Sequence, residues 1–210
     1  MKLDDTAALL IIDVQNDFCT GGALAVPDGE QVVDGINRLN AMFSHTILTQ
    51  DWHPLGHSSF ASSYPGKAAF GSVTLPYGEQ VLWPDHCVQG STGAQFHPEL
   101  DVEHAELVLR KGFRPSIDSY SAFFENDHTT ATGLGGYLRT RGFKSIFLAG
   151  LATDFCVAYS AIDGVREGFD VTVLEDVCRA IDLDGSLAAA WKDMDAVGVR
   201  RATSADLRLS

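Results

Sequence analysis

The sequence predicts an α/β fold in which helices cover both faces of a mainly parallel central sheet, a three-layer α-β-α arrangement with Rossmann-like topology. Three observations predict it. Apolar strands alternate with helix-like segments, and several strands are continuously apolar, as expected for strands buried on both faces. The length of 210 residues with 45% hydrophobic content suits one large domain. Ligands of such sheets bind beyond the carboxyl ends of the strands.

The N-terminal part of the chain contains two predicted strands and a helix between them. Residues 7–12 are a continuous apolar run that Asp13 closes, which is typical of a buried parallel strand. Residues 28–43 follow a proline–aspartate start signal and carry apolar side chains at near-helical spacing, so they predict a helix. Residues 46–50 form a second short strand that ends at Asp51.

The composition changes in the middle of the chain. Residues 52–98 contain five prolines and many glycine, serine and aromatic residues. A long irregular stretch within a compact domain is usually functional. We therefore expect one domain over residues 1–210, with an irregular insertion at about 52–98. Residues 107–111 follow as a third strand, with Lys111 at its carboxyl end.

Helices and strands alternate more regularly in the C-terminal half. The expected elements are a helix over 133–141, a strand before Gly150, a helix from 154 to about 167, a strand over 171–174, a helix over about 187–197 and a short edge segment near Arg200. The strand ends then bring four reactive positions to one rim of the sheet, namely Asp13, Asp51, Lys111 and Cys156.

Charge and cysteine usage limit the classes of partner. The net charge of −13 argues against non-specific binding of nucleic acid or of an anionic membrane, so a neutral or cationic small molecule is the easier partner. The apolar run 7–12 is too short for a membrane span or a signal peptide. Four widely spaced cysteines without a C-x-x-C pair predict a reduced, cytoplasmic protein. A homo-oligomer is left open.

Cys156 follows an apolar strand and a glycine-marked turn, in the expected first turn of a helix. Helix N-termini favour a thiolate and can bind an oxyanion, although a free cysteine can also be a small core residue. Asp13 and Lys111 could complete a nucleophilic site, because an ammonium favours the thiolate and a carboxylate can accept the thiol proton. The structural alternatives are a helix cap for Asp13 and a solvent-directed side chain for Lys111.

A second group of residues has the chemistry of a metal site. Asp51 and His53 can point to the same side of an extended segment, and His86 is a third candidate ligand. Two nitrogens and one oxygen suit a divalent ion such as zinc and leave coordination positions open. The alternative for this Asp-x-His pair is a solvated turn. His57 could be a further ligand, but a histidine that hydrogen-bonds its own loop is the preferred interpretation.

Five segments together resemble those of one enzyme family, in the same order and over roughly residues 7 to 180. They are Asp13–Phe18 (DVQNDF), Asp51–Pro54 (DWHP), Trp83–Gly90 (WPDHCVQG), Arg110–Gly112 (RKG) and Gly150–Val157 (GLATDFCV). The family is that of the nicotinamidases, also called pyrazinamidases, which are isochorismatase-like hydrolases. These motifs are specific in combination though not singly. The resemblance implies the isochorismatase-like fold.

The resemblance also implies a reaction. The expected activity is hydrolysis of nicotinamide, and also of pyrazinamide, to the acid and ammonia, in NAD salvage. Cys156 would be the nucleophile that forms a thioester, Asp13 the general base and acid, and Lys111 their electrostatic partner. The backbone N–H groups of Ala152 and Cys156 would form the oxyanion hole, and the bond from Leu151 to Ala152 would be cis, as is common in the family.

The binding residues implied by the resemblance lie around the same rim. Phe18 and Trp83 would flank the substrate ring, with Tyr120 and Ala152 completing the pocket. The ring nitrogen would approach one divalent metal ion, zinc first and iron or manganese as alternatives, held by three ligands, Asp51, His53 and His86. Variable loop lengths in the family put the assignments of Tyr120 and His57 in doubt.

Two other classes of function compete with this interpretation. One is another hydrolase of the superfamily, such as an isochorismatase-type vinyl ether hydrolase or a carbamoyl amidase. Relatives of the isochorismatase type generally lack this cysteine and the metal ligands, which weighs against the former. The other class is a catalytically silent binding or scaffold protein with a structural metal, which the intact trio Asp13, Lys111 and Cys156 disfavours.

Overall fold

Six parallel strands form the central sheet, in the order β6-β3-β2-β7-β8-β9. The computed structural model describes residues 1–209. The strands are β2 (Ala7–Ile12), β3 (Thr46–Asp51), β6 (Ala105–Lys111), β7 (Ser145–Leu151), β8 (Asp170–Arg179) and β9 (Arg200–Ala202). This order is that of a doubly wound sheet, whose winding direction reverses between β2 and β7.

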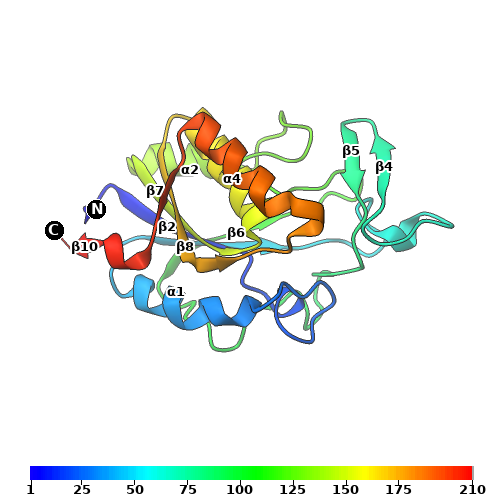
Figure 1. The fold of residues 1–210 in the computed structure, drawn as a ribbon, viewed down its shortest axis with the longest axis horizontal. Helices are drawn as coiled ribbons and strands as arrows, with labels where there is room; N and C mark the ends of the chain where they lie inside the picture. The colour runs from blue at the N-terminus through cyan, green and yellow to red at the C-terminus, as the bar shows by residue number, and fades with distance from the viewer. Residues whose placement is uncertain (210) are drawn as a thin grey trace.

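Helices cover both faces of the sheet (Figure 1). They are α1 (Val32–Asn40), α2 (Leu134–Arg141), α3 (Ala158–Arg166) and α4 (Ser186–Val197). Figure 1 shows α1 on one side and α2 and α4 on the other, and α3 packs between β8 and α4. The predicted three-layer α-β-α fold is therefore confirmed.

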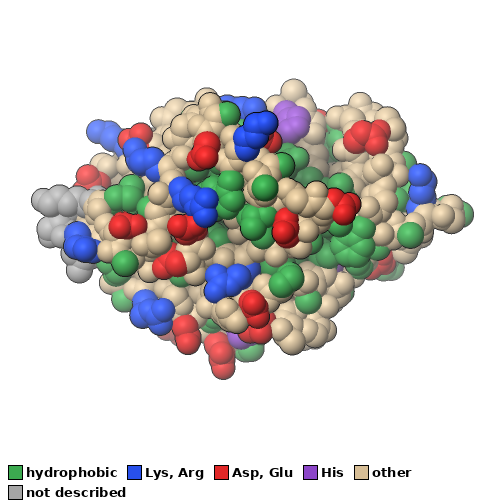
Figure 2. Space-filling model, viewed as in Figure 1, with side chains coloured by type: hydrophobic (Ala, Val, Ile, Leu, Met, Phe, Trp, Pro, Cys, Tyr) green, Lys and Arg blue, Asp and Glu red, His purple; other side chains and the backbone are tan. Residues whose placement is uncertain are grey.

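Burial explains the apolar runs of the sequence. Every residue of β2 and β3 is buried, because both strands lie inside the sheet and are covered on both faces. The edge strand β6 instead alternates between exposed and more buried residues. Acidic and basic side chains are interspersed over the face shown in Figure 2. Within residues 1–209, none of the helices combines the length and the apolar character that a membrane crossing requires.

Several element bounds differ from the sequence-based expectations. The helix predicted over 28–43 begins with a 3-10 turn, η2 (Gly29–Gln31), and becomes α-helical only over α1. The helix predicted from residue 154 begins with one π-helical turn, η4 (Thr153–Val157), before α3. Hydrophobic spacing locates a helix but does not distinguish these tighter or wider turns from the α-helix.

The insertion is less irregular than predicted. It contains the 3-10 turn η3 (Ala61–Ser63) and an antiparallel hairpin of β4 (Ser72–Leu75) and β5 (Gly78–Val81), which stands apart from the central sheet in Figure 1. The chain ends also pair, as parallel strands β1 (Lys2–Leu3) and β10 (Arg208–Leu209). The remaining short 3-10 turns are η1 (Asn16–Phe18), η5 (Leu183–Gly185) and η6 (Ser204–Asp206).

Strand register brings the reactive positions together. Asp51 pairs with Lys111 at the ends of β3 and β6, and Ile12 pairs with Gly150 near the ends of β2 and β7. Gly150 has a φ of 120°, and a Cβ atom there would lie 2.1 Å from the Ile12 carbonyl oxygen. Glycine therefore permits the close approach of β2 and β7 at the point where Asp13 leaves the sheet.

Candidate active site

The Lys111 side chain lies at the centre of the site and is fully buried. Its Nζ atom lies 2.8 Å from Asp13 Oδ2 and 3.3 Å from Cys156 Sγ, and it also contacts the Asp51 carboxylate. Nζ further donates to the Ser119 carbonyl oxygen at 3.0 Å. Burial acts to lower the pKa of Lys111, but Asp13 and Asp51 outweigh burial and raise it. Lys111 is therefore a buried ammonium, and the solvent-directed alternative is wrong.

Asp13 is fully buried and has a left-handed backbone, with a φ of 48°. The Oδ1 atom of Asp13 accepts a hydrogen bond from the Thr49 hydroxyl at 2.6 Å. The backbone N–H of Asp13 donates to the oxygen of the same hydroxyl at 3.1 Å. Oδ2 contacts Lys111 Nζ, and within residues 1–209 no group reaches it with hydrogen-bond geometry. The Asp13 carboxyl also interacts with the Cys156 thiol. Burial raises the pKa of Asp13, and Lys111 only partly opposes this. A carboxylate with a free lone pair and a raised pKa is suited to accept a proton.

Cys156 lies in the π-helical turn η4, beside Asp13. The thiol sulfur and single carboxylate oxygens of Asp13 and Asp51 all lie within 4.8 Å of one another. Burial raises the pKa of Cys156 well above its usual range, and Lys111 acts in the opposite direction. Burial thus opposes the thiolate that the sequence predicts, whereas the Lys111 ammonium favours it.

The segment before Cys156 has the backbone that the resemblance implied. The peptide bond between Leu151 and Ala152 is cis. Ala152 is buried and lines the same cavity as Cys156.

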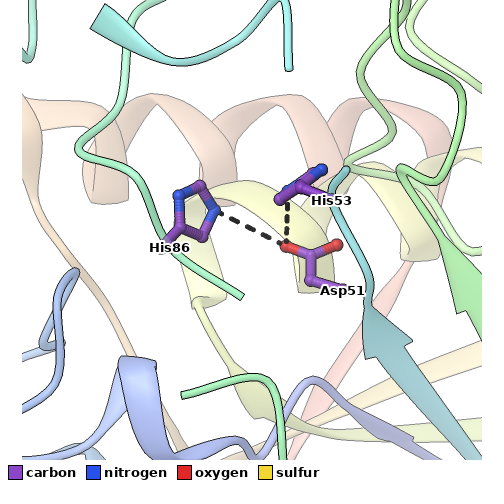
Figure 3. A group of neighbouring side chains, drawn as sticks. All are labelled: Asp51, His53 and His86. Atoms are coloured by element: carbon purple, nitrogen blue, oxygen red, sulfur yellow. Dashed lines mark ion pairs between the residues drawn. The ribbon is translucent and has the colours of Figure 1, made fainter. Parts of the chain in front are cut away.

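Asp51, His53 and His86 converge in one buried cluster (Figure 3). Asp51 Oδ2 lies 3.6 Å from His53 Nε2 and 3.9 Å from His86 Nε2. Asp51 ends β3 and His53 follows it, whereas His86 comes from the loop after β5. One ligand atom from each residue lies within 4.8 Å of the others.

Hydrogen bonds select the tautomer of both histidines. The Nδ1 atom of His53 lies 2.8 Å from the Gly112 carbonyl oxygen, and that of His86 lies 2.8 Å from the Pro84 carbonyl oxygen. Because a carbonyl only accepts, each Nδ1 is the protonated nitrogen in neutral imidazole, and each Nε2 keeps its lone pair toward Asp51. Burial lowers the pKa of His86 to about 4. These donors fit a divalent metal ion.

Gly112 makes room for this arrangement. It has a φ of 66°, and a Cβ atom there would lie 2.4 Å from His53 Cε1. Burial acts to lower the pKa of His53, but Asp51, Asp118 and the Gly112 carbonyl together outweigh burial and raise it.

His57 lies beside this cluster, with its ring centroid 4.4 Å from that of His53. Its Nε2 atom donates to the carbonyl oxygens of Arg114 and Ile117, at 2.9 and 3.1 Å, and its Nδ1 lies 2.8 Å from Ser59 Oγ. Both ring nitrogens therefore bond to the surrounding loops, while ligand atoms of His57, His53 and Asp118 also lie within 4.8 Å of one another.

Aromatic side chains enclose a cavity next to the nucleophile and the metal cluster. The empty space is about 340 Å³, including the part open to solvent. The rings of Trp83 and Phe155 meet edge to face with centroids 4.9 Å apart, and Trp83 Nε1 donates to the Tyr120 hydroxyl at 3.1 Å. The cavity is lined by residues from six parts of the chain, among them Phe18, Leu24, Ala152, Cys156 and Ile181. Its lining combines flat aromatic rings with a few polar groups, as is typical of small-molecule sites.

Sequence reasoning missed four lining residues, namely Leu24, Asp118, Phe155 and Ile181. Asp118 is buried, and its Oδ1 atom lies 4.0 Å from His53 Nε2. It belongs to the irregular segment after β6, where no spacing pattern marks it. Phe155 lies within the segment that carries the family resemblance and directly precedes Cys156, so its place beside the cavity could have been predicted.

Comparison with known proteins agrees with this geometry. Residues 7–206 match the family model described as "Isochorismatase domain". The nicotinamidase of Acinetobacter baylyi is 51% identical over 207 residues, which cover 99% of this chain and 97% of that protein.

Two solved structures share the fold. One is an L. infantum protein in complex with nicotinate, with a TM-score of 0.88 and 38% identity over 100% of this chain and 99% of that chain. The other is a pyrazinamidase of Pyrococcus horikoshii in complex with zinc, with a TM-score of 0.76 and 30% identity over 94% of this chain and 99% of that chain. The chain therefore belongs to the isochorismatase domain family and, within it, to the nicotinamidases.

Proposed function

We propose that the protein is a metal-containing cysteine amidohydrolase that converts nicotinamide to nicotinate and ammonia in NAD salvage, and that also accepts pyrazinamide. The observation that carries this proposal is the position of the Lys111 ammonium. It contacts Asp13, Cys156 and Asp51, and so joins a nucleophile and its base to the metal cluster in one buried site. The identity to the A. baylyi nicotinamidase and the nicotinate complex of the L. infantum protein support it.

The first half of the reaction forms a thioester. Asp13 Oδ2 accepts the thiol proton, and Cys156 Sγ attacks the carboxamide carbon as the proton leaves. The backbone N–H groups of Ala152 and Cys156 stabilise the oxyanion. The C–N bond then breaks, the nitrogen takes the proton from Asp13, and ammonia departs. The Lys111 ammonium stabilises the carboxylate form of Asp13 at the start and end of this half-reaction.

The second half restores the enzyme. Asp13 accepts a proton from a water molecule, whose oxygen attacks the thioester carbon. The C–S bond breaks, nicotinate is released, and the sulfur takes the proton back from Asp13. The sum is one amide and one water converted to one acid and one ammonia.

Binding is assigned to a separate set of residues. Phe18, Trp83, Tyr120 and Ala152 would hold the substrate ring. Three ligands, Asp51, His53 and His86, would hold one divalent ion, most simply zinc, with iron or manganese as alternatives. When bound, the ion supplies a Lewis-acid contact for the ring nitrogen. The zinc complex of the P. horikoshii pyrazinamidase supports this choice.

We also propose that residues 1–210 act as one domain, since the site takes residues from both halves of the chain. A cytoplasmic location is supported by the four cysteines, all free and buried. Homo-oligomer formation stays a prediction.

An ammonia-release assay tests the function. The protein is incubated with nicotinamide, pyrazinamide, an N-carbamoyl amine and the vinyl ether isochorismate in parallel. The vinyl ether contains no nitrogen, so its turnover is followed by pyruvate release. We expect ammonia and the corresponding acid from the two aromatic amides only. Turnover of the vinyl ether or of the carbamoyl compound in preference to nicotinamide would contradict the proposal.

A further inference from the structure

The hairpin of β4 and β5 reaches the active site through one side chain. Of its residues 72–81, all of which are described, Gln80 alone is buried, with 1% of its surface exposed. Its neighbour Glu79 is exposed on the same strand. A buried amide needs hydrogen-bond partners for its two donors and its acceptor. The partners of Gln80 therefore show what the hairpin holds.

The Gln80 amide group is fully bonded. Its Nε2 atom donates to Asp118 Oδ2 and to the Tyr120 hydroxyl, both at 2.9 Å, and lies 2.8 Å from the Val81 carbonyl oxygen. Its Oε1 atom accepts from the Tyr77 hydroxyl at 3.0 Å and from Asn126 Nδ2 at 3.1 Å. The Asp118 carboxylate only accepts, so the nitrogen of the amide must face Asp118 and Tyr120.

These two partners belong to the wall of the cavity. Asp118 Oδ1 lies 4.0 Å from His53 Nε2, and Tyr120 also accepts from Trp83 Nε1 at 3.1 Å. One amide thus joins the carboxylate beside the metal cluster to the aromatic wall that faces the substrate ring.

The segment 118–120 is held from its other side by the nucleophilic group. Lys111 Nζ donates to the carbonyl oxygen of Ser119, between the two partners of Gln80. Gln80 itself makes no hydrogen bond to Asp13, Lys111 or Cys156 among the bonds of residues 1–209. Its loss should therefore displace the ring-binding wall while Lys111 keeps its contacts with the nucleophile and the base.

We propose that Gln80 is a positioning residue for substrate binding: it fixes Asp118 and Tyr120 in the wall and so sets the affinity for the pyridine ring rather than the rate of attack. This inference rests on the proposed function, because it assigns the wall to the ring of nicotinamide. Through Gln80, the hairpin of β4 and β5 also takes part in substrate binding.

The test compares two variants that loosen the wall. Gln80→Leu removes both donors and leaves Asp118 Oδ2 without its partner, so the KM for nicotinamide should rise about tenfold while kcat stays within about twofold. Tyr77→Phe removes the hydroxyl that donates to Gln80 Oε1 and accepts from the Asp118 N–H at 3.4 Å, so it loosens the wall from outside the cavity and should raise KM about threefold. Glu79→Gln is the matched control and should keep the parent KM.

Two further measurements distinguish a positioning role of Gln80 from a general loss of structure in the active site. The Kd of nicotinamide, measured by calorimetry in a Cys156→Ala background, should rise in step with KM. The rate at which iodoacetamide alkylates Cys156 should not change. Parent values of KM and Kd in both variants would overturn the inference, as would a fall in kcat and in alkylation rate at constant KM. If Gln80→Leu does not fold, Gln80→Met, which also removes both donors, takes its place.

The outcome also distinguishes this inference from the proposed function. A parent enzyme that releases no ammonia from nicotinamide would defeat the proposed function, whereas the Kd series would still decide the role of Gln80. Normal parent turnover with unchanged Gln80 variants would defeat the inference alone.

Discussion

At the scale of single residues, hydrogen bonds from Thr49 orient the carboxylate of the proposed base, Asp13. Thr49 and Asp13 exchange two hydrogen bonds, which leaves Asp13 Oδ2 directed at Lys111. Thr49 and Asp51 are two positions apart on β3, so both side chains point to the same face of the sheet. The orientation of Asp13 therefore depends on the strand that also supplies a metal ligand.

The first prediction concerns this hydrogen bond. Thr49→Val keeps the shape of the side chain and removes its donor, so Asp13 Oδ1 is left unpaired and the carboxylate can turn. We expect kcat to fall about tenfold, which corresponds to roughly 1.4 kcal/mol, with KM nearly unchanged. Steady-state ammonia release measures both constants.

Two further variants test whether the loss of activity is specific to the hydrogen bond between Thr49 and Asp13. Thr49→Ser retains the hydroxyl and should recover most of the parent kcat. Thr46→Val is the matched control, since Thr46 is a buried threonine on the same strand that donates to Asn40 Oδ1 at 3.0 Å, outside the active site. Equal losses in the Thr46 and Thr49 variants would mean that β3 is merely destabilised.

The position of Cys156 could be predicted from the sequence, but the ionisation of its thiol could not. The location of Cys156 after a strand and a glycine turn could be predicted, because apolar runs and turn residues are local signals. Its protonation state could not, because the raised pKa comes from burial by distant segments. Asp118 was missed for the same reason, since only the folded chain brings it to His53.

At the scale of elements, the metal cluster depends on the end of β3 and on the loop that carries His86. The second prediction is that removing the metal with a chelator weakens binding of nicotinamide more than binding of benzamide, which has no ring nitrogen to offer a metal. The Asp51, His53 and His86 donors leave coordination positions open for such a contact. Calorimetric titration of both amides, before and after chelation, measures the difference.

Two results would argue against this role. Metal-free protein that prefers nicotinamide over benzamide to the original degree would exclude an orienting metal. Loss of the folded state on chelation would identify a structural ion, because such sites contribute directly to stability.

Sequence reasoning located β2, β3, α2 and α4 to within one residue, but β8, expected over 171–174, extends over Asp170–Arg179. Residues 7–12 and 46–50 were located nearly to their ends, because strands buried on both faces are continuously apolar. The hairpin of β4 and β5 was missed within the insertion, since its short strands are exposed at half of their positions and carry little hydrophobic signal. The buried Gln80 of this hairpin is polar, which obscured it further.

At the scale of the whole molecule, the doubly wound topology explains why one sheet serves both parts of the site. The reversal between β2 and β7 places Asp13 beside the segment of Ala152 and Cys156, and the β3–β6 pair adds Asp51 and Lys111. The fold class, and the edge of the sheet that carries the site, were predictable from the order of elements alone. The short distance between the nucleophilic group and the metal cluster was not, because it depends on the register of the strands in three dimensions.

The central claim is that Cys156 carries the reaction while other residues hold the substrate. The most direct measurement is ammonia release by metal-loaded Cys156→Ala, with the Kd of nicotinamide determined on the same preparation. The account predicts no turnover above the buffer rate and a Kd within about threefold of the parent KM, since the aromatic walls and the metal cluster remain. Hydrolysis by this variant at a rate near that of the parent would contradict the thioester route.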